Sequence, residues 1–178
     1  MKKLLLGFLL MAVTNLALAV TIAEYIKING PLMVEKGVLD LRNSGITSLD
    51  GIEVIEAPRM VTKLYFSNNQ ITSISASHLD QFPNLIVLDL SKNRLTDFPA
   101  ISMKNLRELN LEGNKIEALK NLNLPKLKKL RTDGNPLKTV TNLYAPAVKK
   151  FKVVKDPKKL VKTVRSISVG DLETIDID

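Results

Sequence analysis

Apolar residues return at fixed intervals along most of the chain, in the order Leu-x-x-Leu-x-Leu-x-x-Asn-x-Leu. Equivalent leucines lie 25, 24, 21 and 21 residues apart. A period of roughly 20–50 residues is the signature of a repeat architecture. The central apolar pair, the polar position and the following apolar position occur five times: Leu39, Leu41, Ser44, Ile46; Leu64, Phe66, Asn69, Ile71; Leu88, Leu90, Asn93, Leu95; Leu109, Leu111, Asn114, Ile116; Leu130, Thr132, Asn135, Leu137.

Each repeat predicts a short strand followed by a turn. Around Leu64 and Phe66 apolar and polar residues alternate, so one face of the strand points into a core while Lys63, Tyr65 and Ser67 point out. A single unit cannot bury its apolar face alone. We therefore expect the units to stack with their strands parallel and to share one continuous core.

The recurring asparagine follows the strand, where the chain turns. Its side-chain amide both donates and accepts hydrogen bonds, so it can satisfy backbone groups of neighbouring turns. We therefore expect a ladder of structural asparagines, with Ser44 in the place of the first one and Thr132 in an inward position of the last repeat. These departures indicate that the two ends of the array are less regular than its middle.

The pattern resembles that of the leucine-rich repeat family over roughly Leu39 to Asp156. The resemblance implies an α/β fold, a single right-handed solenoid with a parallel β-sheet on its concave face and short helical or extended convex connections. The compact fourth unit, residues 106–126, is similar to the short repeats of bacterial internalin-like proteins. Continuing the last spacing predicts a sixth, degenerate strand and hence about six strands, through Val148, Phe151, Val153 and Asp156.

The first nineteen residues predict a secretory signal peptide. A basic start at Lys2 and Lys3 precedes an apolar run from Leu4 to Val13, and Ala17-Leu18-Ala19 is a small-x-small cleavage motif. A membrane anchor is the alternative, but the apolar run is shorter than the roughly 20 residues that cross a bilayer. We therefore expect a secreted or periplasmic protein of bacterial type that begins after Ala19.

Four segments follow from these patterns: a signal peptide at 1–19, an N-terminal cap at 20–37, the repeats at 38–156, and a C-terminal cap or tail at 157–178. The cap prediction rests on apolar residues before the turn signal Asn29-Gly30-Pro31, namely Ile22, Tyr25, Ile26 and Ile28. After Asp156 two patterns remain open: a helix lined by Leu160, Val164 and Ile167, or a strand with Val161, Ile167 and Val169.

The chain contains no cysteine, which excludes disulfide staples and the cysteine-capped ends of extracellular relatives. Its net charge is +8. Much of this excess lies near the C-terminus, where Lys149 to Arg165 holds eight basic residues against Asp156. Such a run is more often a solvated face than a binding site.

Outward strand positions predict rows of side chains along the concave sheet. The rows predict an acidic middle around Asp89, Glu108 and Glu112 and a basic end beyond it. Tyr65 is the aromatic anchor expected of an interface, where tyrosine is enriched among hot spots. The candidate partner-binding residues are Arg42, Lys63, Tyr65, Asp89, Glu108, Asn110, Glu112, Lys129, Arg131, Lys150 and Lys152.

Catalytic motifs are not evident. His78 is the sole histidine, and no cysteine accompanies it in a metal site or a nucleophilic pair. We therefore expect a monomeric binding module for a protein partner, with no cofactor, metal, enzymatic activity or small-molecule substrate. The alternative is a binder of anionic surfaces, such as phosphate, acidic glycan or nucleic acid, through the basic C-terminal end that includes Lys129 and Arg131.

Overall fold

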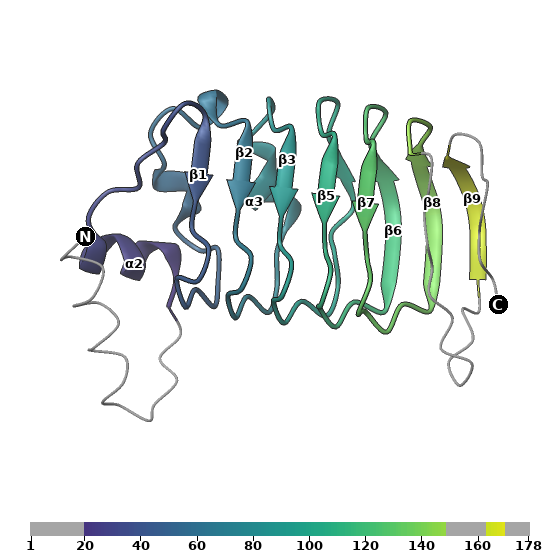
Figure 1. Ribbon diagram of the computed structural model, residues 1–178, viewed down its shortest axis with the longest axis horizontal. Helices are drawn as coiled ribbons and strands as arrows, with labels where there is room; N and C mark the ends of the chain where they lie inside the picture. The colour runs from purple at the N-terminus through teal and green to yellow at the C-terminus, as the bar shows by residue number, and fades with distance from the viewer. Residues whose placement is uncertain (1–19, 149–162, 170–178) are drawn as a thin grey trace.

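The computed structural model describes residues 20–148 and the backbone of 163–169 (Figure 1). Several predictions lie outside the described residues: the signal peptide, the greater part of the sixth strand, residues 149–162 of the basic run, and the two candidate lysines Lys150 and Lys152. Within residues 20–148 and 163–169, no helix has the length and apolar character needed to cross a bilayer.

Five parallel strands, one from each clear repeat, form a sheet along one face of the molecule (Figure 1). Their register aligns Leu39, Leu64, Leu88, Leu109 and Leu130 side by side. This five-stranded sheet confirms the predicted solenoid of stacked, in-register coils. In spatial order its strands are β1 (Val38–Asp40), β2 (Lys63–Tyr65), β3 (Val87–Asp89), β5 (Glu108–Asn110) and β7 (Lys129–Arg131).

Four further strands form a second parallel sheet on the opposite face. Its strands, in order, are β4 (Ile101–Ser102), β6 (Ala118–Asn123), β8 (Thr139–Ala145) and β9 (Thr163–Val169). The extended alternative is therefore right for residues 163–169, and the helical alternative is wrong there.

Coil length explains where this four-stranded sheet begins. The first two coils, 25 and 24 residues long, return through helical turns: η1 (Ile52–Val54) and η2 (Pro58–Met60) in the first, and α3 (Ala76–Asp80) in the second. The 21-residue coils that follow hold fewer residues for the same return path, so their convex segments are extended. Extended neighbours at equal positions can form backbone hydrogen bonds, which is the pairing observed between β6 and β8.

An eight-residue helix, α2 (Ile22–Asn29), precedes the repeats. Thr21 caps it, since its hydroxyl accepts from the backbone N–H of Glu24 and the carboxylate of Glu24 accepts from the backbone of Thr21. Ile22 is fully buried, and the Ala23 N–H donates to the Asp50 carbonyl of the first coil at 3.3 Å. Ile28, expected with the apolar residues of the cap, is 60% exposed, because it points away from that contact.

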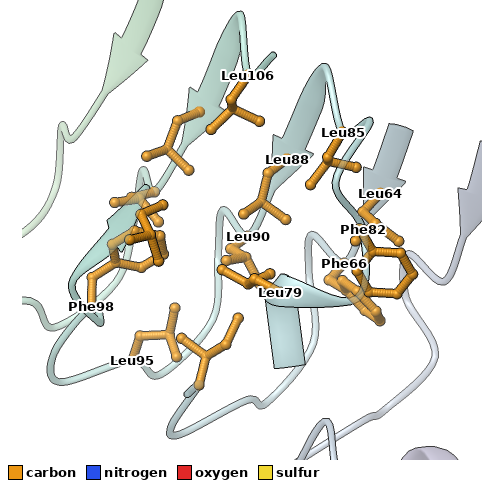
Figure 2. Close-up of a cluster of buried hydrophobic side chains, with 14 of the residues drawn as sticks. Leu64, Phe66, Leu79, Phe82, Leu85, Leu88, Leu90, Leu95, Phe98 and Leu106 are labelled. Carbon is orange, nitrogen blue, oxygen red and sulfur yellow. The ribbon is translucent and has the colours of Figure 1, made fainter. Parts of the chain in front are cut away.

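The two sheets and the helical turns enclose one elongated apolar core. Figure 2 shows its central part, where Leu64, Leu88 and Leu106 from successive coils meet Phe82 and Phe98 from the convex connections. Each of these side chains is at most 5% exposed. The side chains that the convex connections contribute to the core include Phe82, Phe98, Leu119 and Leu122.

The asparagine ladder is also confirmed. Asn93 accepts from the backbone N–H of Ile71 at 3.0 Å and donates to the carbonyls of Phe66 and Leu90 at 2.9 and 3.0 Å. Each asparagine thus bonds the coil before it as well as its own turn. Ser44 needs no such side chain, because no repeat precedes its coil in the described structure. The same pattern recurs at Asn69, Asn114 and Asn135.

Candidate functional site

The outward face of the five-stranded sheet carries three rows of side chains, one row for each outward position. Backbone pairing places Asp40, Tyr65, Asp89, Asn110 and Arg131 in the middle row. Neighbouring members lie about 4.8 Å apart, the spacing of parallel strands. The described candidates, Arg42, Lys63, Tyr65, Asp89, Glu108, Asn110, Glu112, Lys129 and Arg131, all belong to this face.

Tyr65 is half-buried, and a side chain of the adjacent coil contacts its ring. The guanidinium carbon of Arg42 lies 5.2 Å from the centroid of the Tyr65 ring, which is a cation–π contact. Asp40 in turn accepts from Nε of Arg42 at 2.8 Å, and this hydrogen bond lowers the pKa of the Asp40 carboxyl group. Asp40 was absent from the predicted site, yet it fixes the arginine that lies on the ring.

Two valines lie near this cluster, in the first row of outward side chains. Val38 and Val87 are outward and only half-buried, and they lie on either side of Lys63. Together with Tyr65 they give strands β1 to β3 three half-exposed apolar side chains around the exposed Lys63. We call Val38, Tyr65 and Val87 the anchor surface. Because rigid strands hold these side chains, little conformational entropy remains to be lost when a partner covers them.

The three carboxylates of the predicted acidic middle have different surroundings in the structure. Glu108 accepts a 3.0 Å hydrogen bond from Nζ of Lys129, so its charge is balanced within the first row. Asp89 accepts from the N–H and hydroxyl of Ser91 at 2.9 and 2.7 Å. Glu112 lies in the third row, where the next residue along is Asp133 and not a base. The acid-to-base order therefore holds along the first two rows and not along the third.

Both ring nitrogens of His78 have partners that fit a structural role. Its Nδ1 accepts from the backbone N–H of Ser75 at 3.4 Å, within the capping box of α3. Its Nε2 lies 3.5 Å from Oδ1 of Asp50 in the preceding coil. In the described part of the chain, no three His, Asp or Glu side chains are grouped closely enough to hold a metal ion.

Comparison with protein families agrees with this geometry. Two models of the leucine rich repeat family match the chain, one over residues 59–116 and the other over residues 105–144. Residues 59–144 of the chain thus match the leucine rich repeat family. A search of curated proteins finds no match to it. The matched residues run from η2 to β8, so the two models include strands of both sheets.

Leucine-rich repeat proteins generally serve as scaffolds that bind other proteins rather than as enzymes. A short parallel sheet with fixed outward side chains suits this role, because the repeats hold the surface while the outward residues vary. In this chain, the outward residues of β1 to β3 include Tyr65, the one aromatic side chain among the described outward positions of the face.

Proposed function

We propose that the chain is a leucine-rich repeat protein and that it binds a protein partner through the outward face of its five-stranded sheet. The anchor surface of Val38, Tyr65 and Val87 carries the proposal, because it combines half-exposed apolar groups with a fixed aromatic ring. Tyrosine is enriched among residues that dominate binding energy, and such residues lie near the centre of an interface with polar groups around them. Here the surrounding polar groups are Arg42, Asp40, Lys63, Asp89 and Ser91.

Charged side chains on β5 and β7, on the same face, can orient a bound partner. Glu112 and Asp133 are acidic at the C-terminal ends of β5 and β7, while Lys129 and Arg131 are basic. Charges arranged in this way steer a partner and select its orientation more than they raise affinity. The partner we propose is a folded or extended protein segment with an apolar group for the anchor surface and charges of both signs beside it.

Replacement of Tyr65 by alanine tests the proposal, and Tyr144 provides a matched control. Tyr144 is 48% exposed on β8, on the opposite face of the molecule. Immobilised unaltered protein, Tyr65→Ala and Tyr144→Ala would be incubated with envelope and extracellular extracts, and captured proteins compared by quantitative mass spectrometry. We expect one or more proteins to be captured by the unaltered and Tyr144→Ala forms and to be depleted at least about tenfold with Tyr65→Ala, since hot-spot truncation costs about 2 kcal/mol or more.

Circular dichroism and thermal unfolding would show that both variants keep the fold. Capture profiles that are the same for Tyr65→Ala and for the unaltered protein would overturn the proposed face. Equal losses with Tyr65→Ala and Tyr144→Ala would do so as well, because the opposite face would then matter equally.

We further propose that the protein is exported, cleaved after Ala19, and acts as a monomer outside the cytoplasm. The observation that supports cleavage there is that the carbonyl of Val20, the next residue, accepts from the N–H of Thr47 at 2.9 Å. A chain that begins at Val20 therefore retains its contact with the first coil. N-terminal sequencing of the protein recovered from the periplasm and the culture medium tests the proposal, and recovery of the uncleaved chain only from the cytoplasm would refute it.

A further inference from the structure

Stacking of the coils segregates charge onto one edge of the molecule. The segments that lead into β2, β3, β5 and β7 are residues 59–63, 83–87, 104–108 and 125–129, and they hold seven basic residues and one acidic residue. Residues 20–148 as a whole hold 16 basic and 13 acidic residues, or +3. The edge therefore carries +6 and the rest of residues 20–148 carries −3. We call these four segments the basic edge.

The basic edge is continuous because backbone hydrogen bonds join its segments. The backbone N–H of Ile86 donates to the carbonyl of Thr62 at 2.7 Å. The N–H of Arg107 donates to the carbonyl of Ile86, and that of Lys128 to the carbonyl of Arg107, both at 2.8 Å. Four neighbouring coils span about 14 Å at the parallel-strand spacing. The turns of this edge are at the top of Figure 1, at the N-terminal ends of the five-stranded sheet.

A shallow hollow of about 220 Å³ lies in this edge, lined by Thr62, Asn84, Ile86, Asn105, Arg107 and Lys126. Its polar groups are fixed in position. Asn105 donates to the carbonyl of Pro83 at 3.3 Å and accepts from Nζ of Lys126 at 3.1 Å, and Asn84 donates to the carbonyl of Arg59 at 2.9 Å. Ile86 adds a half-buried apolar side chain to the lining.

The cations of the edge are free to meet a ligand. Among the described residues only Lys129 of the seven forms an ion pair, with Glu108. The other six are Arg59, Lys63, Lys104, Arg107, Lys126 and Lys128. These six cations lie on three of the four coils, across a span of about 14 Å, and residues 83–87 between them hold none. Such an arrangement matches a ligand that lies across the coils and carries several negative charges along its length.

Three classes of polyanion could meet these cations. Single-stranded nucleic acid is bound through aromatic side chains on which its bases stack, and the four segments of the basic edge contain no aromatic residue. A flat anionic membrane would leave the hollow unfilled. A sugar chain uses all that is present: its acidic groups meet the cations, its hydroxyl groups meet the asparagine amides, and the apolar face of a ring can contact Ile86.

We propose that the basic edge binds an acidic polysaccharide, a sugar chain that carries carboxylate or sulfate groups, with one sugar unit in the hollow between Asn84 and Lys126. None of the residues that line the hollow belongs to the anchor surface, although the basic edge also includes Val87 of that surface and the adjacent Lys63. The proposal therefore stands independently of the protein partner proposed above.

The test uses the double variant Arg107→Glu/Lys126→Glu and a control of equal net charge, Arg94→Glu/Lys115→Glu. Arg94 and Lys115 are exposed and lie beyond the C-terminal ends of the strands, on the opposite edge. The milder variant Arg107→Gln/Lys126→Gln serves if the charge reversal impairs folding, which thermal unfolding would show. Affinity for heparin, for polygalacturonate and for uncharged dextran would be measured by calorimetry at low and physiological salt.

We expect binding of heparin or polygalacturonate but not of dextran, and a loss of about tenfold or more in Arg107→Glu/Lys126→Glu, with a smaller loss in the glutamine variant. Affinity should fall as salt rises. The control should change by less than about twofold, since its charges lie on the opposite edge of the sheet and salt screens charges at long range.

Three results would overturn the proposal. The first is the absence of binding to both acidic polysaccharides at low salt. The second is an equal loss of affinity in Arg107→Glu/Lys126→Glu and in Arg94→Glu/Lys115→Glu. Net charge alone would then explain the effect. The third is stronger binding to a single-stranded oligonucleotide or to vesicles of anionic lipid, because the ligand would then belong to another class.

Discussion

Arg42 lies over the ring of Tyr65 in the neighbouring coil, with 5.2 Å between the guanidinium carbon and the ring centroid. The same arginine donates to Asp40, and this hydrogen bond is the main reason that the pKa of Asp40 lies below its ordinary value of 3.8. The anchor surface is thus linked to one titrating carboxylate. The position of Arg42 over the Tyr65 ring should therefore depend on the charge of Asp40.

Acid should release Arg42 from Asp40. Because the folded pKa of Asp40 is below its unfolded value, the contact stabilises the fold above pH 3.8 and is lost as the pH falls through the lowered pKa. A side-chain NMR titration should place the Asp40 midpoint below 3.8, and Arg42→Gln should raise it. Both side chains are about half exposed, so the stability change should stay below about 1 kcal/mol. A midpoint at or above 3.8 in the unaltered protein would contradict this account.

Replacement of Asn93 by alanine should lower the free energy of unfolding by about 1–3 kcal/mol, because it leaves the buried N–H of Ile71 unpaired and removes one of the two amide donors to each of the Phe66 and Leu90 carbonyls. Asn123→Ala is the control, since Asn123 is exposed and its amide donates only to Ser102. It should change stability by less than about 0.5 kcal/mol. Urea unfolding measures both values. Equal effects of the two variants would show that the ladder is not a main source of stability.

Gly51 should tolerate alanine less well than Gly113. Both have positive φ, at +93° and +68°, which strains an L-residue by about 1–2 kcal/mol. A Cβ at Gly51 would lie 2.6 Å from the backbone nitrogen of Ala23, whereas a Cβ at Gly113 meets nothing closer than 3.6 Å. Gly51→Ala should therefore also displace α2, visible as faster amide exchange in residues 22–29. Similar thermal shifts and unchanged exchange in both variants would argue against this contact.

Adjacent residues of β3 should respond differently to truncation. Leu88 is fully buried, so Leu88→Ala should cost about 2–5 kcal/mol. Val87 points outward and is half-buried, so Val87→Ala should cost less than about 1 kcal/mol. Chemical unfolding of the two variants measures the difference. A larger loss for Val87 than for Leu88 would reverse the assignment of the two sides of the strand.

Much of the fold could be predicted from the chain alone. The repeat period placed Leu39, Leu64 and Leu88 at equivalent positions, and the alternation around Leu64 assigned Tyr65 to the outward face. Both are local properties, so no contact between distant segments had to be known. The exposure of Ile28 and the pairing of β6 with β8 were not predictable in this way, because each depends on what lies beside the segment in space.

The candidate site was only partly predictable. Outward positions could be identified by periodicity, but the contact of Arg42 with Tyr65 and the pairing of Lys129 with Glu108 depend on rotamers across two coils. The basic edge escaped prediction for a related reason. Its signal was present as the cation-rich segments 104–107 and 126–129 just before two strands, but the net charge of the C-terminal region obscured it.

The sequence by itself determined the coil, namely its length, its inward leucines and its turn asparagines, because periodic burial and turn chemistry are written into neighbouring residues. Only the tertiary structure decided which charges lie together. Cations in residues 104–108 and 125–129 are far apart along the chain, and they become neighbours because backbone hydrogen bonds stack the coils at the spacing of a parallel sheet. Those in residues 59–63 join the same edge two coils from residues 104–108.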